Sequence, residues 1–226
     1  MTRSDTKQRI LDGALALFNV HGATAVSTNH IADELNISPG NLYYHFRSRD
    51  DIVDALFHRF EAEIDCVLQP PDLPVADPAG TWIYLHLVFE TIARYRFIYW
   101  ELNRLLSGNA FWRRRFRHVM DRKVVTSRAY CQGLKTAGYL NATDEEIDSL
   151  AENIALITTF WLNFEYVRGV TSLDEAAINQ GIRQVFALVA SWLTPDARDY
   201  LETLSRQYRE SPPAVPGDEA EGRQRF

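Results

Sequence analysis

Three side chains with hydrogen-bonding groups lie close together in this 226-residue chain: Asn41, Tyr44 and His45. Their spacing places them on one side of a short helix, because residues three and four apart share a helical face. An amide, a phenol and an imidazole can each bond a phosphate oxygen or a base edge in the major groove of DNA. The chemistry that these residues predict is nucleic-acid recognition.

Two short helices separated by a tight turn are predicted to position these side chains. Ser38 followed by Pro39 suits the start of the second helix, because serine caps a helix and proline fits its first turn. Ser48 and Asp51 resemble a capping box that opens a longer helix directly behind it. A helix of about eight residues is marginal alone in water, so packing must hold it. The apolar positions predicted to do so are Ile31, Ala32, Leu35, Leu42, Tyr43 and Phe46. The pattern is that of a helix-turn-helix.

The amino-terminal quarter of the chain resembles the TetR family of bacterial transcriptional regulators. The resemblance rests on Phe18-Asn19-Val20-His21-Gly22, on the pair Ile31-Ala32, and on Ser-Pro-Gly-Asn-Leu-Tyr-Tyr-His-Phe at 38–46. It implies that DNA is touched by Thr28, Asn41, Tyr43, Tyr44, His45 and Arg49. Many members have Thr where Asn41 stands and Lys where Arg49 stands. We add Lys7, Asn29, Ser38 and Gly40 to the expected DNA-binding residues.

The charge balance is unusual for a DNA-binding chain. The net charge is −6, and the first sixty residues hold six Lys or Arg against seven Asp or Glu. Because attraction to phosphate normally supplies much of the affinity, local placement of Lys7, Arg9, Arg47 and Arg49 must provide the favourable field. Only two cysteines are present, no apolar segment is long enough to span a membrane, and no signal segment leads the chain. These features predict a cytoplasmic protein with free thiols.

The whole chain is predicted to be all-α. We expect a three-helix DNA-binding domain over 1–50, a connecting helix over 51–68, a Pro-rich linker over 69–80, a larger helical domain over 81–210 and a disordered tail over 211–226. The expected helices outside the motif are 5–20, 49–67, 79–94, 96–107, 109–136, 144–168, 173–193 and 195–209. Gly108, Gly138 and the capping boxes at Thr143 and Ser172 mark several of their ends.

The helices over 144–168 and 173–193 are apolar around most of their girth. Such helices are either central core helices or are covered by the core on one side and by a partner on the other. The resemblance implies that these two helices form a dimer, which also suits paired half-sites in DNA. The expected dimer residues are Ile157, Trp161, Phe164, Ile182, Val185 and Val189.

The middle helices are rich in aromatic residues, which are either ordinary core or the wall of a cavity with a few polar contacts. The cavity interpretation predicts a small hydrophobic or amphipathic effector. Its expected contacts are His86, Phe89, Glu90, Trp100, Asn103, Phe116, Trp161 and Glu165. The basic run from Arg113 to His118 is either a solvated helix face or, through Arg113 and Arg117, an anchor for an anionic group.

These features together favour a dimeric, ligand-responsive transcriptional regulator, most simply a repressor that an effector releases from a palindromic operator. A ligand that promotes DNA binding and an architectural protein without an effector stay open. An enzyme is the competing class, with His86 and Glu90 or His58 and Glu61 as potential metal ligands. Since no second ligand pair, phosphate loop or nucleophile motif accompanies them, we expect no catalytic residue, metal or cofactor.

Overall fold

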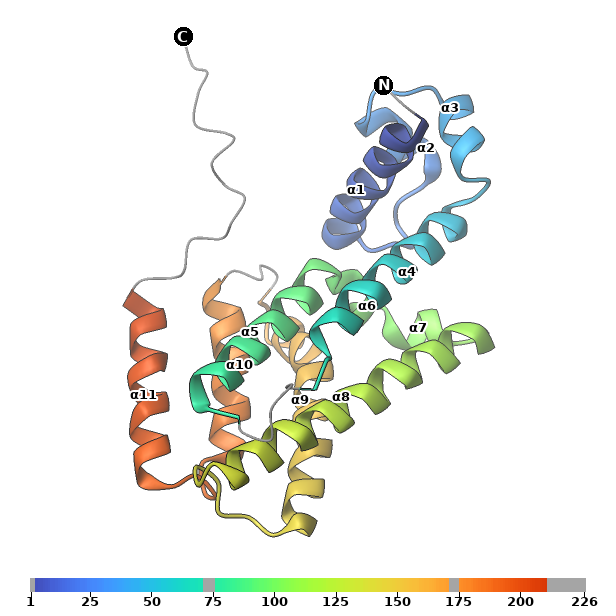
Figure 1. The fold of residues 1–226 in the computed structure, drawn as a ribbon. Helices are drawn as coiled ribbons and strands as arrows, with labels where there is room; N and C mark the ends of the chain where they lie inside the picture. Colours follow the sequence, from blue (N-terminus) through green and yellow to red (C-terminus); the bar gives the residue numbers. More distant parts are fainter. Residues whose placement is uncertain (1–2, 71–75, 171–174, 211–226) are drawn as a thin grey trace.

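The computed structural model describes residues 3–70, 76–170 and 175–210, and it is helical throughout (Figure 1). The described residues contain no strand and only one isolated bridge, between Leu140 and Leu193. None of the described helices is long and apolar enough to cross a membrane. The all-α prediction is confirmed. The helices are α1 (Arg3–His21), α2 (Thr28–Glu34), α3 (Pro39–His45), α4 (Arg49–Val67), α5 (Pro78–Arg94), α6 (Arg96–Trp100), α7 (Leu102–Leu106), α8 (Ala110–Thr136), α9 (Asp144–Val167), α10 (Glu175–Val189) and α11 (Pro195–Glu210).

Helix α4 joins the two parts of the molecule. It packs against α1 at one end and against α5 and α8 further along (Figure 1). Its start is fixed by a complete capping box, in which Ser48 accepts from the Asp51 backbone and the Asp51 side chain accepts from the Ser48 backbone. The bounds predicted for this helix, 49–67, are confirmed at both ends, because α4 runs from Arg49 to Val67.

The start of α8 is held against α4 by an aromatic contact. The Trp112 indole stacks on the Phe57 ring with centroids 4.0 Å apart, and its Nε1 donates to Asp54 Oδ1 at 2.6 Å. One turn further along each helix, Arg115 forms an ion pair with Glu61, whose side chain is buried. These contacts tie α8 to the helix that leads to the amino-terminal part.

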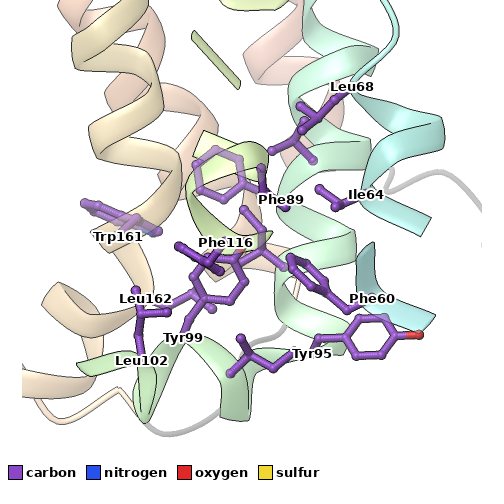
Figure 2. Close-up of a cluster of buried hydrophobic side chains, with 14 of the residues drawn as sticks. Phe60, Ile64, Leu68, Phe89, Tyr95, Tyr99, Leu102, Phe116, Trp161 and Leu162 are labelled. Carbon is purple, nitrogen blue, oxygen red and sulfur yellow. The ribbon is translucent and has the colours of Figure 1, made fainter. Parts of the chain in front are cut away.

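The buried core runs without interruption from α1 to α11. In its middle, aromatic rings from α4, α6 and α8 meet edge to face, as Figure 2 shows for Phe60, Tyr99 and Phe116. Aromatic side chains supply much of the buried apolar area in such cores. Most of the aromatic residues that could have lined a cavity are therefore packed core.

Several predicted boundaries differ from the structure. The helix expected over 96–107 is broken at Glu101, where the backbone leaves helical geometry (φ −102°, ψ 15°) and the side chain accepts from Thr24 Oγ1 at 3.0 Å. The helix expected over 173–193 ends at Val189, and α5 starts inside the expected linker, at Pro78. The capping box at Thr143 is confirmed. Residue Ser172, part of the linker and the expected tail over 211–226 lie outside the described residues.

Candidate nucleic-acid interface and effector region

The α2–α3 unit has the turn and caps of a helix-turn-helix. Ser27 caps α2 by accepting from the His30 N–H at 3.1 Å, and Ser38 caps α3 by accepting from the Asn41 N–H at 3.2 Å. Between the helices Asn36 has a positive φ of 52°. Asparagine tolerates this left-handed conformation better than most residues, and it lets the chain reverse tightly.

Helix α3 is anchored on one side and open on the other. Leu42 is fully buried and Phe46, at the carboxyl end, is 5% exposed. Asn41, Tyr43 and Tyr44 are exposed, and His45 is half-buried with its ring 5.2 Å from that of Tyr44. The seven-residue helix is thus held by its apolar face, which leaves a polar and aromatic face toward solvent.

The remaining residues expected at DNA surround this face. Thr28 and Tyr43 share a hydrogen bond of 3.1 Å between their hydroxyls, which joins the start of α2 to α3. Lys7 is exposed, with Nζ 5.5 Å from the centroid of the Phe46 ring. Arg49 differs: its guanidinium donates to the Thr24 carbonyl and pairs with Asp50. The expected residues Asn29, Ser38 and Gly40 are all exposed.

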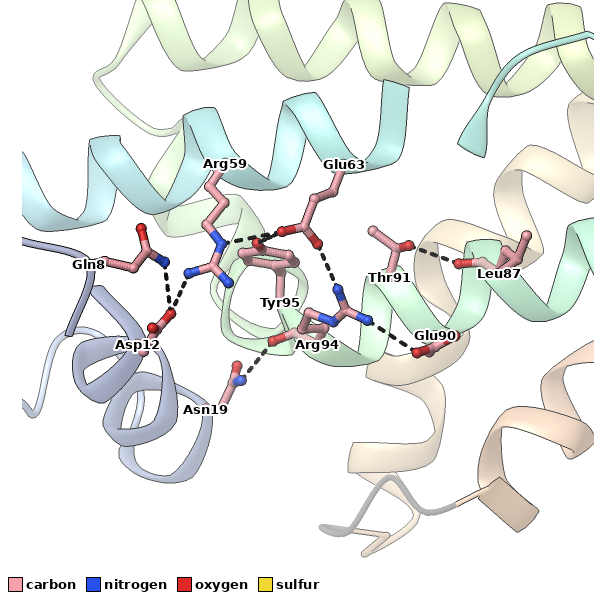
Figure 3. Close-up of polar contacts among 10 residues, drawn as sticks. All are labelled: Gln8, Asp12, Asn19, Arg59, Glu63, Leu87, Glu90, Thr91, Arg94 and Tyr95. Atoms are coloured by element: carbon pink, nitrogen blue, oxygen red, sulfur yellow. Dashed lines mark hydrogen bonds and ion pairs between the residues drawn. The ribbon is translucent and has the colours of Figure 1, made fainter. Parts of the chain in front are cut away.

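A polar network that the sequence pattern did not indicate links α1, α4 and α5 (Figure 3). Arg59 pairs with Asp12 at 2.5 Å and with Glu63 at 3.2 Å. The same Glu63 accepts from Tyr95 Oη at 2.6 Å and from Arg94 at 3.0 Å. Burial and the neighbouring carboxylate both raise the pKa of Tyr95. The only local sequence signal was the Arg59–Glu63 spacing of four residues.

Asn19 makes a second link between α1 and the junction of α5 with α6. It is buried, and its Nδ2 donates to the Arg94 carbonyl at 2.8 Å (Figure 3). Its Oδ1 accepts from the Phe97 N–H at 3.2 Å. Arg96 Nε donates to the Asn19 carbonyl at 3.1 Å. The amino-terminal helices and the large helical part are therefore connected by directional bonds as well as by packing.

The eight residues expected at the effector do not line one pocket. Phe89, Phe116 and Trp161 are buried in the packed core (Figure 2). Glu90 pairs with Arg94 at the surface, and Asn103 is exposed. The other expected contacts are the half-buried His86 and Trp100 and the buried Glu165, which pairs with Arg168. The structure therefore does not bring this set together around one described pocket, and its contact with an effector stays a prediction.

A small cavity instead lies between α5, α8, α9 and α10. Its volume is about 30 Å³, and it is lined by Thr81, Tyr84, Leu85, Ser127, Tyr130, Cys131, Leu134, Leu140, Ile154, Val185, Phe186 and Val189. One helical turn before Ser127, Lys123 is buried, and loss of hydration lowers its pKa to about 7. Neither feature was expected, since a lysine in a basic helix gives no sign that it is buried.

The exposed apolar surface of α9 differs from the expected dimer residues. Ile182, Val185 and Val189 are buried against the chain's own core, so placing them at a subunit contact is wrong. Phe164 is 52% exposed and Ile157 is half-buried, whereas Trp161 is buried. The exposed apolar side chains that accompany Phe164 along α9 were missed by the sequence reasoning, and they are Leu156, Phe160 and Val167. A groove runs along this face to Gln184 of α10.

The basic run and the potential metal ligands are mostly surface features. Arg113 and Arg117 are exposed, and Arg113 donates to the Leu106 carbonyl at 2.9 Å. His58 Nδ1 lies 3.9 Å from Glu61 Oε2. Within the described ranges, no three His, Cys, Asp or Glu side chains are grouped so as to hold a metal ion.

Comparison with known proteins agrees with this architecture. Residues 10–56 match the family described as bacterial regulatory proteins, tetR family, and residues 59–201 match the TetR family described as a bacterial transcriptional repressor. A segment of 60 residues is 33% identical to the HTH-type transcriptional regulator AcrR of Shigella flexneri, an alignment that covers 26% of this chain and 28% of AcrR.

Two solved structures resemble the chain over most of its length. A TetR-family regulator from Marinobacter aquaeolei VT8 is 32% identical, with a TM-score of 0.79 over 92% of this chain and 99% of the other. A putative transcriptional regulator from Saccharomonospora viridis, solved in complex with choline, has the same fold at 20% identity, with a TM-score of 0.63 over 83% and 97% of the two chains. The chain belongs to the TetR family of bacterial transcriptional regulators.

Proposed function

We propose that this protein is a dimeric transcriptional repressor that binds a palindromic operator through α3 and is released by a small hydrophobic or amphipathic effector. Such a regulator works in the cytoplasm, where it meets the chromosome. The observation that carries the proposal is the anchored helix α3, whose buried Leu42 and Phe46 leave Asn41, Tyr43 and Tyr44 facing solvent.

In this proposal α3 enters the major groove. Asn41 and Tyr44 reach base edges or phosphates, His45 and Tyr43 support them, and the hydroxyl of Thr28 bonds the backbone of the DNA. Lys7 supplies local positive charge. Arg49 must exchange its bonds to Thr24 and Asp50 for a phosphate, which lowers its net contribution to binding.

Dimerisation is proposed to use the exposed apolar face of α9. Leu156, Phe160, Phe164 and Val167 follow one another at intervals of three or four residues, as on one helical face. A large exposed apolar patch on a small protein marks an interaction surface. A two-fold contact between two copies of this face would place two α3 helices for two half-sites.

The route from effector to DNA is proposed to run through α4. This helix follows α3 directly, packs on α8 and carries Arg59 and Glu63 of the polar network. We propose the division into a DNA-binding domain over 1–50, the connecting helix over 51–68 and the larger domain over 81–210 on this basis. An effector that favours another position of α4 would change the separation of the two α3 helices. The size of this shift in equilibrium is set by how much more tightly the effector binds the released state than the DNA-binding state.

The test is recovery of DNA fragments from the host genome by the purified protein at near-physiological salt. We expect a palindromic sequence to be enriched by the wild type and lost by the double variant Tyr44→Ala, His45→Ala. Tyr200→Ala, which changes an exposed tyrosine on α11, is the matched control and should keep the sequence. Sites that the double variant retains, or no enriched sequence with the wild type, would refute the proposal.

The same assay distinguishes an effector that releases the protein from DNA from one that promotes DNA binding. Adding a metabolite extract of the host should lower recovery of the operator if the protein is a repressor that the effector releases. Increased recovery would assign the opposite sign, and no change with any extract would favour a regulator without an effector.

A further inference from the structure

Lys123 is a buried amino group whose hydrogen-bond partners in the described part of the chain are uncharged. Its side chain is 1% exposed, and Nζ donates to Thr159 Oγ1 at 3.0 Å and to the Thr158 carbonyl at 3.3 Å. Among the residues that the structure describes, no carboxylate pairs with it. Burying an ammonium group without a counter-ion is costly, so an anion bound beside Lys123 would stabilise its protonated form.

The hydroxyl group of Tyr99, whose ring lies beside Lys123, is a buried polar group without a hydrogen-bond partner in the described part of the chain. Lys123 Nζ lies 5.3 Å from the centroid of the Tyr99 ring. Figure 2 shows this ring within the aromatic cluster of the core. Buried polar groups are nearly always paired in native proteins, so an unpaired one calls for an explanation. The Lys123 ammonium only donates and the Tyr99 hydroxyl is able to donate, so a single acceptor between them could bond both groups.

The apolar cavity begins one helical turn away from Lys123. Ser127, which lines it, follows Lys123 by four residues on α8, and Ile154 precedes Thr158 by four residues on α9. Residues four apart share a helical face. The two helices make the most extensive contact between elements in the molecule. Lys123 and the apolar cavity therefore lie next to each other along helices α8 and α9.

We propose that Lys123 and Tyr99 bind the head group of the effector and that the effector is an amphipathic carboxylate. The carboxylate accepts from Lys123 Nζ and Tyr99 Oη, and the apolar part of the molecule extends toward Tyr84, Ile154 and Val185. This inference rests on the proposed function, because it names the class of effector for that regulator. It also places the anionic group at Lys123 and not at the exposed Arg113 and Arg117.

The size of the cavity gives this assignment a consequence for the response. At about 30 Å³ the cavity is far smaller than the pockets of several hundred Å³ that hold most small ligands. An alkanoate chain must therefore move apart the helices that enclose it. Since α8 is tied to α4 by Trp112 and Arg115, this movement reaches the connecting helix.

The test is calorimetric binding of hexanoate, octanoate, decanoate and phenylbutyrate to the full chain, with the alcohols of matched chain as uncharged probes. We expect at least one carboxylate to bind the wild type about tenfold more tightly than its alcohol, as a charge-assisted bond predicts. In Lys123→Met this preference should disappear while the alcohol binds as before, and Tyr99→Phe should weaken the carboxylate several-fold. Lys135→Met, on the same helix but paired with Asp144 at the surface, is the matched control.

Two results would overturn the inference: equal carboxylate affinity in Lys123→Met and the wild type, or no binding of any of the four carboxylates by the wild type. Fragment recovery without ligand is measured on the same preparation. If the wild type recovers the operator but binds no carboxylate, only the inference about the effector is refuted. If the wild type recovers no operator, the proposed function is refuted.

Discussion

Replacing Lys123 by methionine should stabilise the protein at neutral pH. Methionine keeps a flexible apolar side chain of similar length but carries no charge. Burial lowers the pKa of Lys123 from its ordinary value of 10.5 to about 7, so the folded state binds fewer protons than the unfolded state between these two values. The charge is therefore a penalty on folding that is complete below pH 7 and is relieved as the pH rises toward 10.5.

The size of this effect follows from the change in proton affinity. Each tenfold change corresponds to about 1.4 kcal/mol, so the penalty at pH 7 is roughly 4 kcal/mol. The two hydrogen bonds to Thr158 and Thr159 offset about 1–2 kcal/mol of it. We expect Lys123→Met to raise the free energy of unfolding by about 2–3 kcal/mol at pH 7. The gain should shrink by no more than about 1.4 kcal/mol per pH unit and vanish near pH 10.

Urea unfolding of the wild type and Lys123→Met from pH 6 to pH 10, at one protein concentration because the chain is proposed to dimerise, measures this difference. Lys135→Met, whose side chain pairs with Asp144 at the surface, is the control and should differ little from the wild type at any pH. A difference between Lys123→Met and the wild type that is constant across the pH range, or a less stable Lys123→Met at pH 7, would show that Lys123 is not a desolvated cation and would refute the reasoning.

Three further changes test other parts of the structure. Asn19→Ala removes both bonds to the α5–α6 junction, so the free energy of unfolding should fall by about 2–4 kcal/mol in a denaturation assay. An unchanged denaturation midpoint would contradict the stabilising role of this amide. Phe164→Glu places a charge on the exposed face of α9 and should shift the molecular mass in light scattering from dimer to monomer, whereas a persistent dimer would assign the contact elsewhere. Ser48→Ala removes the cap of α4 and should lower the free energy of unfolding by about 1 kcal/mol. Ser107→Ala, which changes an exposed serine outside the helices, is the control and should leave the free energy of unfolding nearly unchanged.

The amino-terminal motif was predictable because its signals are local. Ser38 with Pro39 and Ser48 with Asp51 act within one helical turn, so their hydrogen bonds can be anticipated from neighbours in the sequence. The bounds of α4 followed directly from such signals. The polar face of α3 also followed, because a seven-residue helix must bury Leu42 to be held at all.

The larger part of the chain was harder to predict because its structure depends on distant contacts. A helix that is apolar on two sides does not reveal which side meets its own core, and so Ile182 and Val185 were assigned to the wrong face. The break at Glu101 depends on Thr24, which lies 77 residues away. The burial of Lys123 depends on how α8 lies on α9, and no pattern within a basic helix indicates it.

Because Trp112 stacks on Phe57, its fluorescence can report on the position of the connecting helix α4. The indole sits between α8 and α4, and its Nε1 bonds the carboxylate of Asp54, so any shift of α4 relative to α8 changes both the polarity and the ring contacts around it. A protein in which the other four tryptophans are replaced by phenylalanine would carry a single tryptophan, at the contact between α8 and α4. Its emission would follow the movement of α4 in real time, with no label and without DNA present.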